Sequence, residues 1–110
     1  MNEKDDVAAR ADACLARIAN WLENFDPDEA DYNTGDGVVT IEFPDGARFI
    51  VSRQSATSQI WLAAGAHGWH YSYDPSTDRW IDDKDRHDLY DRLIESMAEK
   101  LGRPISFSIG

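Results

Sequence analysis

The sequence has a single cysteine, Cys14, and no apolar run long enough to cross a membrane. One cysteine excludes an internal disulfide framework and a zinc site built from several cysteines. The chain also lacks the charged and then apolar leader of a secretory signal. We therefore expect a soluble, cytoplasmic protein that forms a single domain over residues 1–110.

Basic residues are scarce, with 11 Lys and Arg against 21 Asp and Glu, for a formal net charge of −10. Such a charge disfavours nucleic acids and anionic membranes as partners and favours cations or basic protein surfaces. The charge is uneven, because residues 1–36 hold ten acids and three bases whereas residues 46–73 hold no acid. This unevenness counts against a DNA mimic, which would need carboxylates along its whole surface.

Catalytic motifs are absent as well. The three histidines are widely separated, no motif pairs a nucleophile with a base, and no glycine-rich phosphate loop occurs. The sequence therefore favours a binding protein over an enzyme.

The periodicity of the apolar residues predicts two helices around a set of strands. We expect the first helix over residues 4–24, with Cys14 on its buried face. Short strands are expected at residues 38–43, 48–54, 59–63, 69–73 and around 80–81. The second helix should be capped by Asp85 and end at Gly102. The extended residues 104–109 either pack along the helices or add an edge strand.

This order, α-β-β-β-β-β-α, predicts an α+β fold, a two-layer α/β sandwich. Two terminal helices would pack on one face of an antiparallel sheet of five to six strands. The other face would be left to solvent or to a partner.

One exposed aromatic residue stands out on that second face. In Gln59–Ala63, alternation places Ile60 and Leu62 in the core and Trp61 outside. Strict alternation adds further polar residues to the same face, and we name the set the tryptophan surface: Ser52, Gln54, Gln59, Trp61 and His70. Its composition is typical of an interaction hot spot. The alternative is a Trp61 ring folded down over its neighbours.

A run of acidic residues follows the first helix. We name it the acidic segment: Glu23, Asp26, Asp28, Glu29 and Asp31. Carboxylates are hard ligands for divalent and ferric cations, and without His or Cys between them binding would be weak and poorly selective. The alternative is a solvated charge run.

The stretches Gly37–Ile41, Arg53-Gln54, Gln59–Ala63 and Trp80-Ile81, ahead of a closing helix, together resemble the frataxin family, in particular its bacterial CyaY-type branch. The similarity covers residues 5–107. It implies a monomeric, iron-binding accessory protein that regulates iron–sulfur cluster assembly or donates iron to it. The resemblance also implies a ferroxidase or iron-storing activity as an alternative, and iron-dependent oligomers.

The resemblance assigns roles to both residue sets. The acidic segment would hold Fe²⁺ or Fe³⁺ weakly, with Asp12 and Asp36 as outlying acids. The acidic segment and the tryptophan surface would dock on the cysteine desulfurase and the iron–sulfur scaffold protein. The sequence departs from the family pattern at Ala19 and Asn20, where many bacterial members carry acids, and at Ser52, where Asn is common. The acidic set is therefore thinner than in those members, and the resemblance does not carry over the number of iron ions bound.

Overall fold

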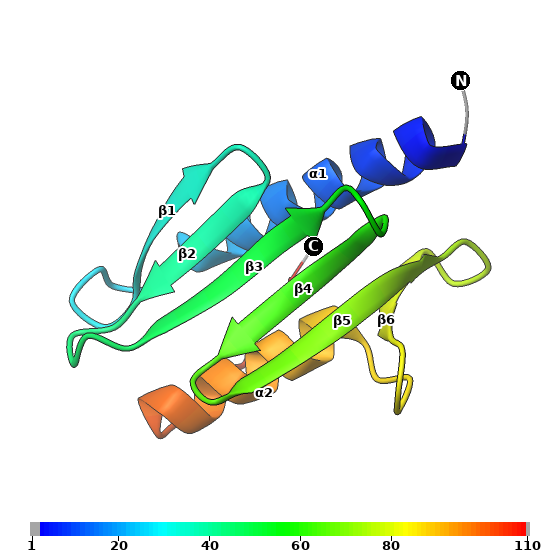
Figure 1. Ribbon diagram of the computed structural model, residues 1–110. Coiled ribbons are helices and arrows are strands. Elements are labelled where there is room, and N and C mark those ends of the chain that lie inside the picture. The colour runs from blue at the N-terminus through cyan, green and yellow to red at the C-terminus, as the bar shows by residue number, and fades with distance from the viewer. Residues whose placement is uncertain (1–2, 110) are drawn as a thin grey trace.

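The computed structural model describes the backbone of residues 3–109 and the side chains of residues 6–109. Its elements follow one another as α1 (Glu3–Leu22), β1 (Asp31–Gly35), β2 (Val38–Glu42), β3 (Arg48–Gln54), β4 (Gln59–Ala64), β5 (His67–Asp74), β6 (Arg79–Asp82) and α2 (Leu89–Leu101). The strands form one six-stranded sheet, and Figure 1 shows the two helices behind it. The predicted two-layer α+β sandwich is confirmed.

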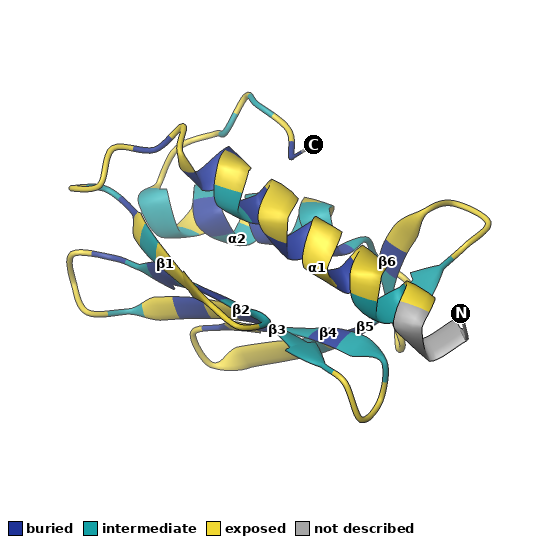
Figure 2. Cartoon of the chain, turned by 90° about the horizontal axis from the view of Figure 1, so that it is seen from above, coloured by how far each residue is buried: buried dark blue, intermediate teal, exposed yellow. Residues whose placement is uncertain are grey.

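The sheet is a meander in which every strand pairs antiparallel with the next, in the order β1-β2-β3-β4-β5-β6. Short runs of β-branched and aromatic residues that are separated by turn residues favour such hairpins. Both helices lie on the same side of the sheet, as Figure 2 shows. The opposite face is therefore not covered by either helix.

The core lies between the two layers and follows the predicted alternation. On β4, Ile60 and Leu62 are buried and Trp61 is half-buried on the other face. The inward side chains of the remaining strands and of both helices complete the core: Ile18, Leu22, Val39, Ile41, Phe49, Val51, Tyr71, Trp80, Leu89, Leu93 and Met97. Cys14 is buried among them, and burial raises the pKa of its thiol to about 12. The thiol is therefore a core side chain, as predicted.

Two details differ from the sequence expectations. The strand β1 was not expected; Asp31–Gly35 has little apolar character and joins the sheet through its backbone pairing with β2. Helix α2 is capped by Asp88, whose side chain accepts the N–H of Asp91, and not by Asp85. The reason is that Arg86 adopts a left-handed φ of 65°, which interrupts any helical backbone between Asp85 and Leu89. Gly102 ends the helix with a φ of 70°, as expected.

The C-terminal residues 104–109 form no strand and pack along the helices. The Phe107 ring contacts Phe25 and Trp21 with centroid separations of 5.2 and 5.9 Å. The indole N–H of Trp21 donates to the Phe107 carbonyl at 3.2 Å. Of the two arrangements considered for this segment, packing along the helices is the one observed.

Candidate binding surfaces

The register of the central strands assembles the tryptophan surface. Ser52 on β3 faces Trp61 on β4, and Trp61 faces His70 on β5. Two residues further along the same pair of strands, Gln54 on β3 faces Gln59 on β4. Two adjacent rows therefore bring together all five residues that alternation placed on this face.

Trp61 is held in place by its neighbours. Its ring stacks on the His70 imidazole with centroids 4.2 Å apart and planes 15° apart. Its indole N–H donates to Gln59 Oε1 at 3.0 Å. The ring therefore lies flat against part of the surface while it remains on the face opposite to the core.

A polar network continues from Gln59 to a residue that the sequence reasoning missed. The Gln59 amide donates to the carboxylate of Asp83 and to Ser72 Oγ, and Ser72 Oγ donates to Asp83 Oδ1 at 2.9 Å. Asp83 follows β6, and its N–H bonds the His70 carbonyl at 3.1 Å. No local pattern signals this contact, because it depends on how the chain after β6 folds back over β5.

Three carboxylates of the acidic segment accept hydrogen bonds from separate groups. Glu23 accepts a hydrogen bond from the Tyr32 hydroxyl at 2.6 Å, which raises the pKa of that hydroxyl. Asp26 Oδ1 accepts the N–H of Asp28 at 2.9 Å. Asp31 lies on the edge strand β1 and accepts the N–H of Tyr32. The carboxylates thus face different local groups.

Arg103, just after α2, forms an ion pair with Glu29 of the acidic segment. Its guanidinium donates to both carboxylate oxygens of Glu29, with an Nε–Oε2 distance of 3.1 Å. Glu29 raises the pKa of Arg103 through this bond. Glu29 is therefore partly neutralised, which sequence reasoning could not anticipate because 74 positions separate the two residues.

The two outlying acids meet a cation as well. Arg53 on β3 pairs with Asp12 of α1 and with Asp36 in the β1–β2 turn, so one guanidinium links both to the sheet. Within residues 6–109, no three carboxylates of the acidic segment approach one another closely enough to share one metal ion. The acidic segment offers exposed, separate carboxylates rather than a closed cage.

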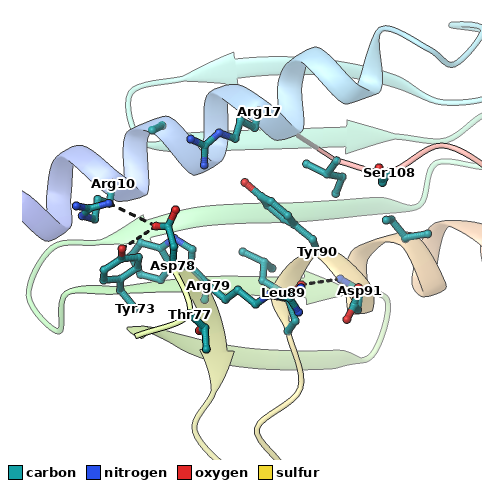
Figure 3. Close-up of a pocket in the computed structure, with 15 residues that line it drawn as sticks. Arg10, Arg17, Tyr73, Thr77, Asp78, Arg79, Leu89, Tyr90, Asp91 and Ser108 are labelled. Atoms are coloured by element: carbon teal, nitrogen blue, oxygen red, sulfur yellow. Dashed lines mark hydrogen bonds and ion pairs between the residues drawn. The ribbon is translucent and has the colours of Figure 1, made fainter. Parts of the chain in front are cut away.

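A pocket of about 350 Å³ lies elsewhere, between α1, α2 and the β5–β6 hairpin. Figure 3 shows the Asp78 carboxylate between the Arg10 guanidinium and the Tyr73 hydroxyl, at 3.4 and 2.7 Å. No residue of the acidic segment or of the tryptophan surface lines this pocket. Gln54 and Gln59 of the tryptophan surface line a separate pocket of about 340 Å³ beside α1.

The comparison with protein families agrees with the resemblance read from the sequence. The model of the frataxin-like domain matches residues 3–103. The chain belongs to the frataxin family. A relative from Thioalkalivibrio sulfidiphilus, named iron–sulfur cluster assembly protein CyaY, is 35% identical over 96 residues, which cover 86% of this chain and 90% of the relative.

Solved frataxin structures share the fold. Frataxin from Psychromonas ingrahamii, studied for stability within the CyaY family, has a TM-score of 0.83 and 26% identity, and the match covers 98% of this chain and 99% of the other. Trimeric yeast frataxin complexed with ferrous iron has a TM-score of 0.74 and 24% identity, covering 86% of this chain and 87% of the other. Across the part of this chain that the structure describes, no helix is long and apolar enough to span a membrane.

Proposed function

We propose that this frataxin-family chain is an iron-binding accessory protein that regulates iron–sulfur cluster assembly. It would do so by docking on the cysteine desulfurase and its scaffold protein through the acidic segment and the tryptophan surface. The proposal is supported by the name of the Thioalkalivibrio relative, an iron–sulfur cluster assembly protein.

The observation that carries the docking role is the arrangement around Trp61. A large aromatic ring on an uncovered sheet face is already oriented by His70 and Gln59. A side chain that is ordered before binding loses less conformational entropy when a partner covers it. An oriented Trp surrounded by amide and imidazole groups is thus suited to anchor an interface.

The carboxylates of the acidic segment support the iron role. Asp26, Asp28 and Asp31 are exposed and carry no ion pair with another described residue. Exposed carboxylates bind hard cations weakly and exchange them readily, because water competes for every ligand position. Weak and exchangeable binding suits an accessory protein or iron donor better than a ferroxidase, which needs paired ions in fixed geometry.

A ¹H–¹⁵N NMR titration with Fe²⁺ under anaerobic conditions, followed by the desulfurase, tests both surfaces. Iron should broaden the amides of residues 23–31 and leave the Trp61 indole signal sharp. The desulfurase should then perturb both regions. Iron that leaves residues 23–31 unaffected would remove the metal role of the acidic segment, and a desulfurase that leaves Trp61 unaffected would remove the docking role of the tryptophan surface.

A further inference from the structure

A third set of metal-ligating side chains lies where β6 leads into α2, in the loop whose Asp83 contacts the tryptophan surface. It consists of Asp82, Asp85 and His87. One ligand atom from each residue lies within 4.8 Å of the other two. Among residues 6–109 this is the one group of three His, Cys, Asp or Glu side chains with that geometry.

Asp82 is the buried charge of this group, with an exposed fraction of 3%. Its Oδ2 accepts the N–H groups of Lys84 and Asp85 at 2.8 and 2.9 Å. Within residues 6–109, no hydrogen bond reaches Oδ1, and no Lys or Arg pairs with this carboxylate. Oδ1 is not sealed in the core, because among the described residues Arg92 Nε is the fully buried side-chain polar atom without a partner. The Asp82 carboxylate therefore has an oxygen available for a cation.

His87 presents one ring nitrogen to the group and is fixed through the other. Nδ1 meets the Asp85 carboxylate, and Nε2 lies 2.7 Å from the hydroxyl of Tyr71, which is fully buried. Metal-ligating histidines commonly have their second nitrogen held by such a partner, which sets the ring orientation. A tyrosine hydroxyl can either donate or accept, so it can serve both tautomers of His87.

The backbone holds these side chains in position. The N–H of Asp82 donates to the His87 carbonyl at 2.9 Å, which closes the loop that contains Asp85. Asp88 then caps α2 directly after the loop. A site whose ligands are positioned by anchored backbone needs little rearrangement on binding.

We propose that Asp82, Asp85 and His87 form a binding site for a divalent first-row transition metal such as Co²⁺, Fe²⁺ or Zn²⁺. One imidazole nitrogen and two carboxylate oxygens suit these borderline cations better than Ca²⁺ or Mg²⁺, which prefer oxygen alone. Three protein ligands leave positions for water. When the metal binds Nδ1, the single proton of the neutral imidazole sits on Nε2, where it donates to the Tyr71 hydroxyl.

This site is independent of the proposed function. It lies beside β6, at the opposite edge of the sheet from β1 and the acidic segment (Figure 1). Separate amide signals therefore report on the two sites in a single titration. If the acidic segment responds to metal and the loop does not, only the loop site is wrong; the reverse result would contradict only the iron role of the acidic segment.

Titration of metal-free protein with Co²⁺, followed by visible absorption and ¹H–¹⁵N NMR, tests the site. Co²⁺ should broaden the amides of residues 82–88 at equimolar concentration and give an absorption band typical of nitrogen and oxygen ligands. His87→Gln should weaken this binding by at least about tenfold, because it removes a ligand nitrogen. Asp85→Asn, at a largely exposed side chain, should weaken it in the same direction while the fold stays intact.

The matched control is His67→Gln, which removes an exposed histidine outside the loop and should leave the loop signals unchanged. The amide spectrum of each variant without metal verifies that it folds. Loop amides that do not respond to Co²⁺, or a His87→Gln protein that binds as tightly as the wild type, would overturn the proposal. An equal loss in His67→Gln would show adventitious histidine binding only and would overturn it as well.

Discussion

At the scale of single residues, Trp61 combines features that seldom occur together on a free surface. It lies on the face opposite to the core, yet it is half-buried because its ring stacks on His70. Its N–H is already bonded to Gln59, so a partner would meet mainly the apolar face of the indole. This favours burial of apolar area, rather than a new hydrogen bond, as the source of affinity.

Replacing this ring gives the first residue-scale prediction. Trp61→Ala should weaken desulfurase binding by about 2 kcal/mol, because it removes the aromatic anchor from the centre of the proposed interface. The free energy of unfolding should change by less than about 1 kcal/mol, since the side chain contributes no contact to the core. Calorimetric titration and urea unfolding measure the two quantities.

Ile50→Ala is the matched control, because Ile50 is also an exposed apolar residue on the outer sheet face, with an exposed fraction of 38%. It lies outside the network of Gln59, His70 and Asp83, and we expect a clearly smaller loss of affinity. Equal losses in both variants would mean that general apolarity, and not the oriented Trp61, determines binding.

Side-chain direction on the central strands was predictable, because the alternation of a strand is a local property. Ile60, Trp61 and Leu62 lie as the period of two requires. The partners of the acidic segment were not predictable, since Glu29 meets Arg103 only after α2 has packed. The face of the sheet on which a residue lies can therefore be predicted from the sequence more readily than its hydrogen-bond partner.

At the scale of elements, the edge strand β1 shows where pattern reading fails. Its residues, Asp31 to Gly35, are mostly exposed, so no alternation of apolar and polar residues marks it. The strand exists because its backbone groups pair with β2, which supplies the apolar side chains. As a consequence Asp31 lies on a strand rather than in the acidic loop expected from the sequence.

The C-terminal segment is the element whose stability role can be tested most directly. Phe107→Ala should lower the free energy of unfolding by about 2 kcal/mol, less than for a fully buried Phe, because this side chain is half-buried. The loss comes from its ring contacts with Trp21 and Phe25. Urea unfolding followed by Trp fluorescence and circular dichroism measures it.

Ser106→Ala is the neighbouring control, because the Ser106 side chain is exposed. We expect a change within about 0.5 kcal/mol for this variant. A Phe107→Ala protein that is as stable as Ser106→Ala would show that the segment covers the helices without stabilising them.

At the scale of the whole molecule, charge divides the protein into regions. The stretch without acids, residues 46–73, corresponds to β3, β4 and most of β5, the centre of the sheet. Carboxylates gather beyond its two edges, in the acidic segment and in the loop after β6. Among the described acidic residues, Asp83 alone bonds to the tryptophan surface. A basic partner would thus be attracted by the edges and then contact a nearly neutral centre.

This division predicts separate effects on the kinetics of association with the desulfurase. The double change Asp26→Asn and Asp28→Asn should lower the association rate by about threefold to tenfold at low salt and flatten its salt dependence. The backbone turn should persist, because Asn retains the Oδ1 acceptor that Asp26 uses. Trp61→Ala should instead raise the dissociation rate, because short-range contacts act after encounter.

The control for the charge effect is the pair Glu95→Gln and Glu99→Gln, which removes the same charge from the exposed side of α2. Exposed charges farther apart than about 10 Å are largely screened at 0.1 M salt, so the position of a charge matters as well as the total. Stopped-flow association at several salt concentrations separates the two contributions. If the association rates of both double variants depend equally on salt concentration, net charge alone steers the encounter. A weaker salt dependence for the acidic-segment variant alone would place the attraction at that edge of the sheet.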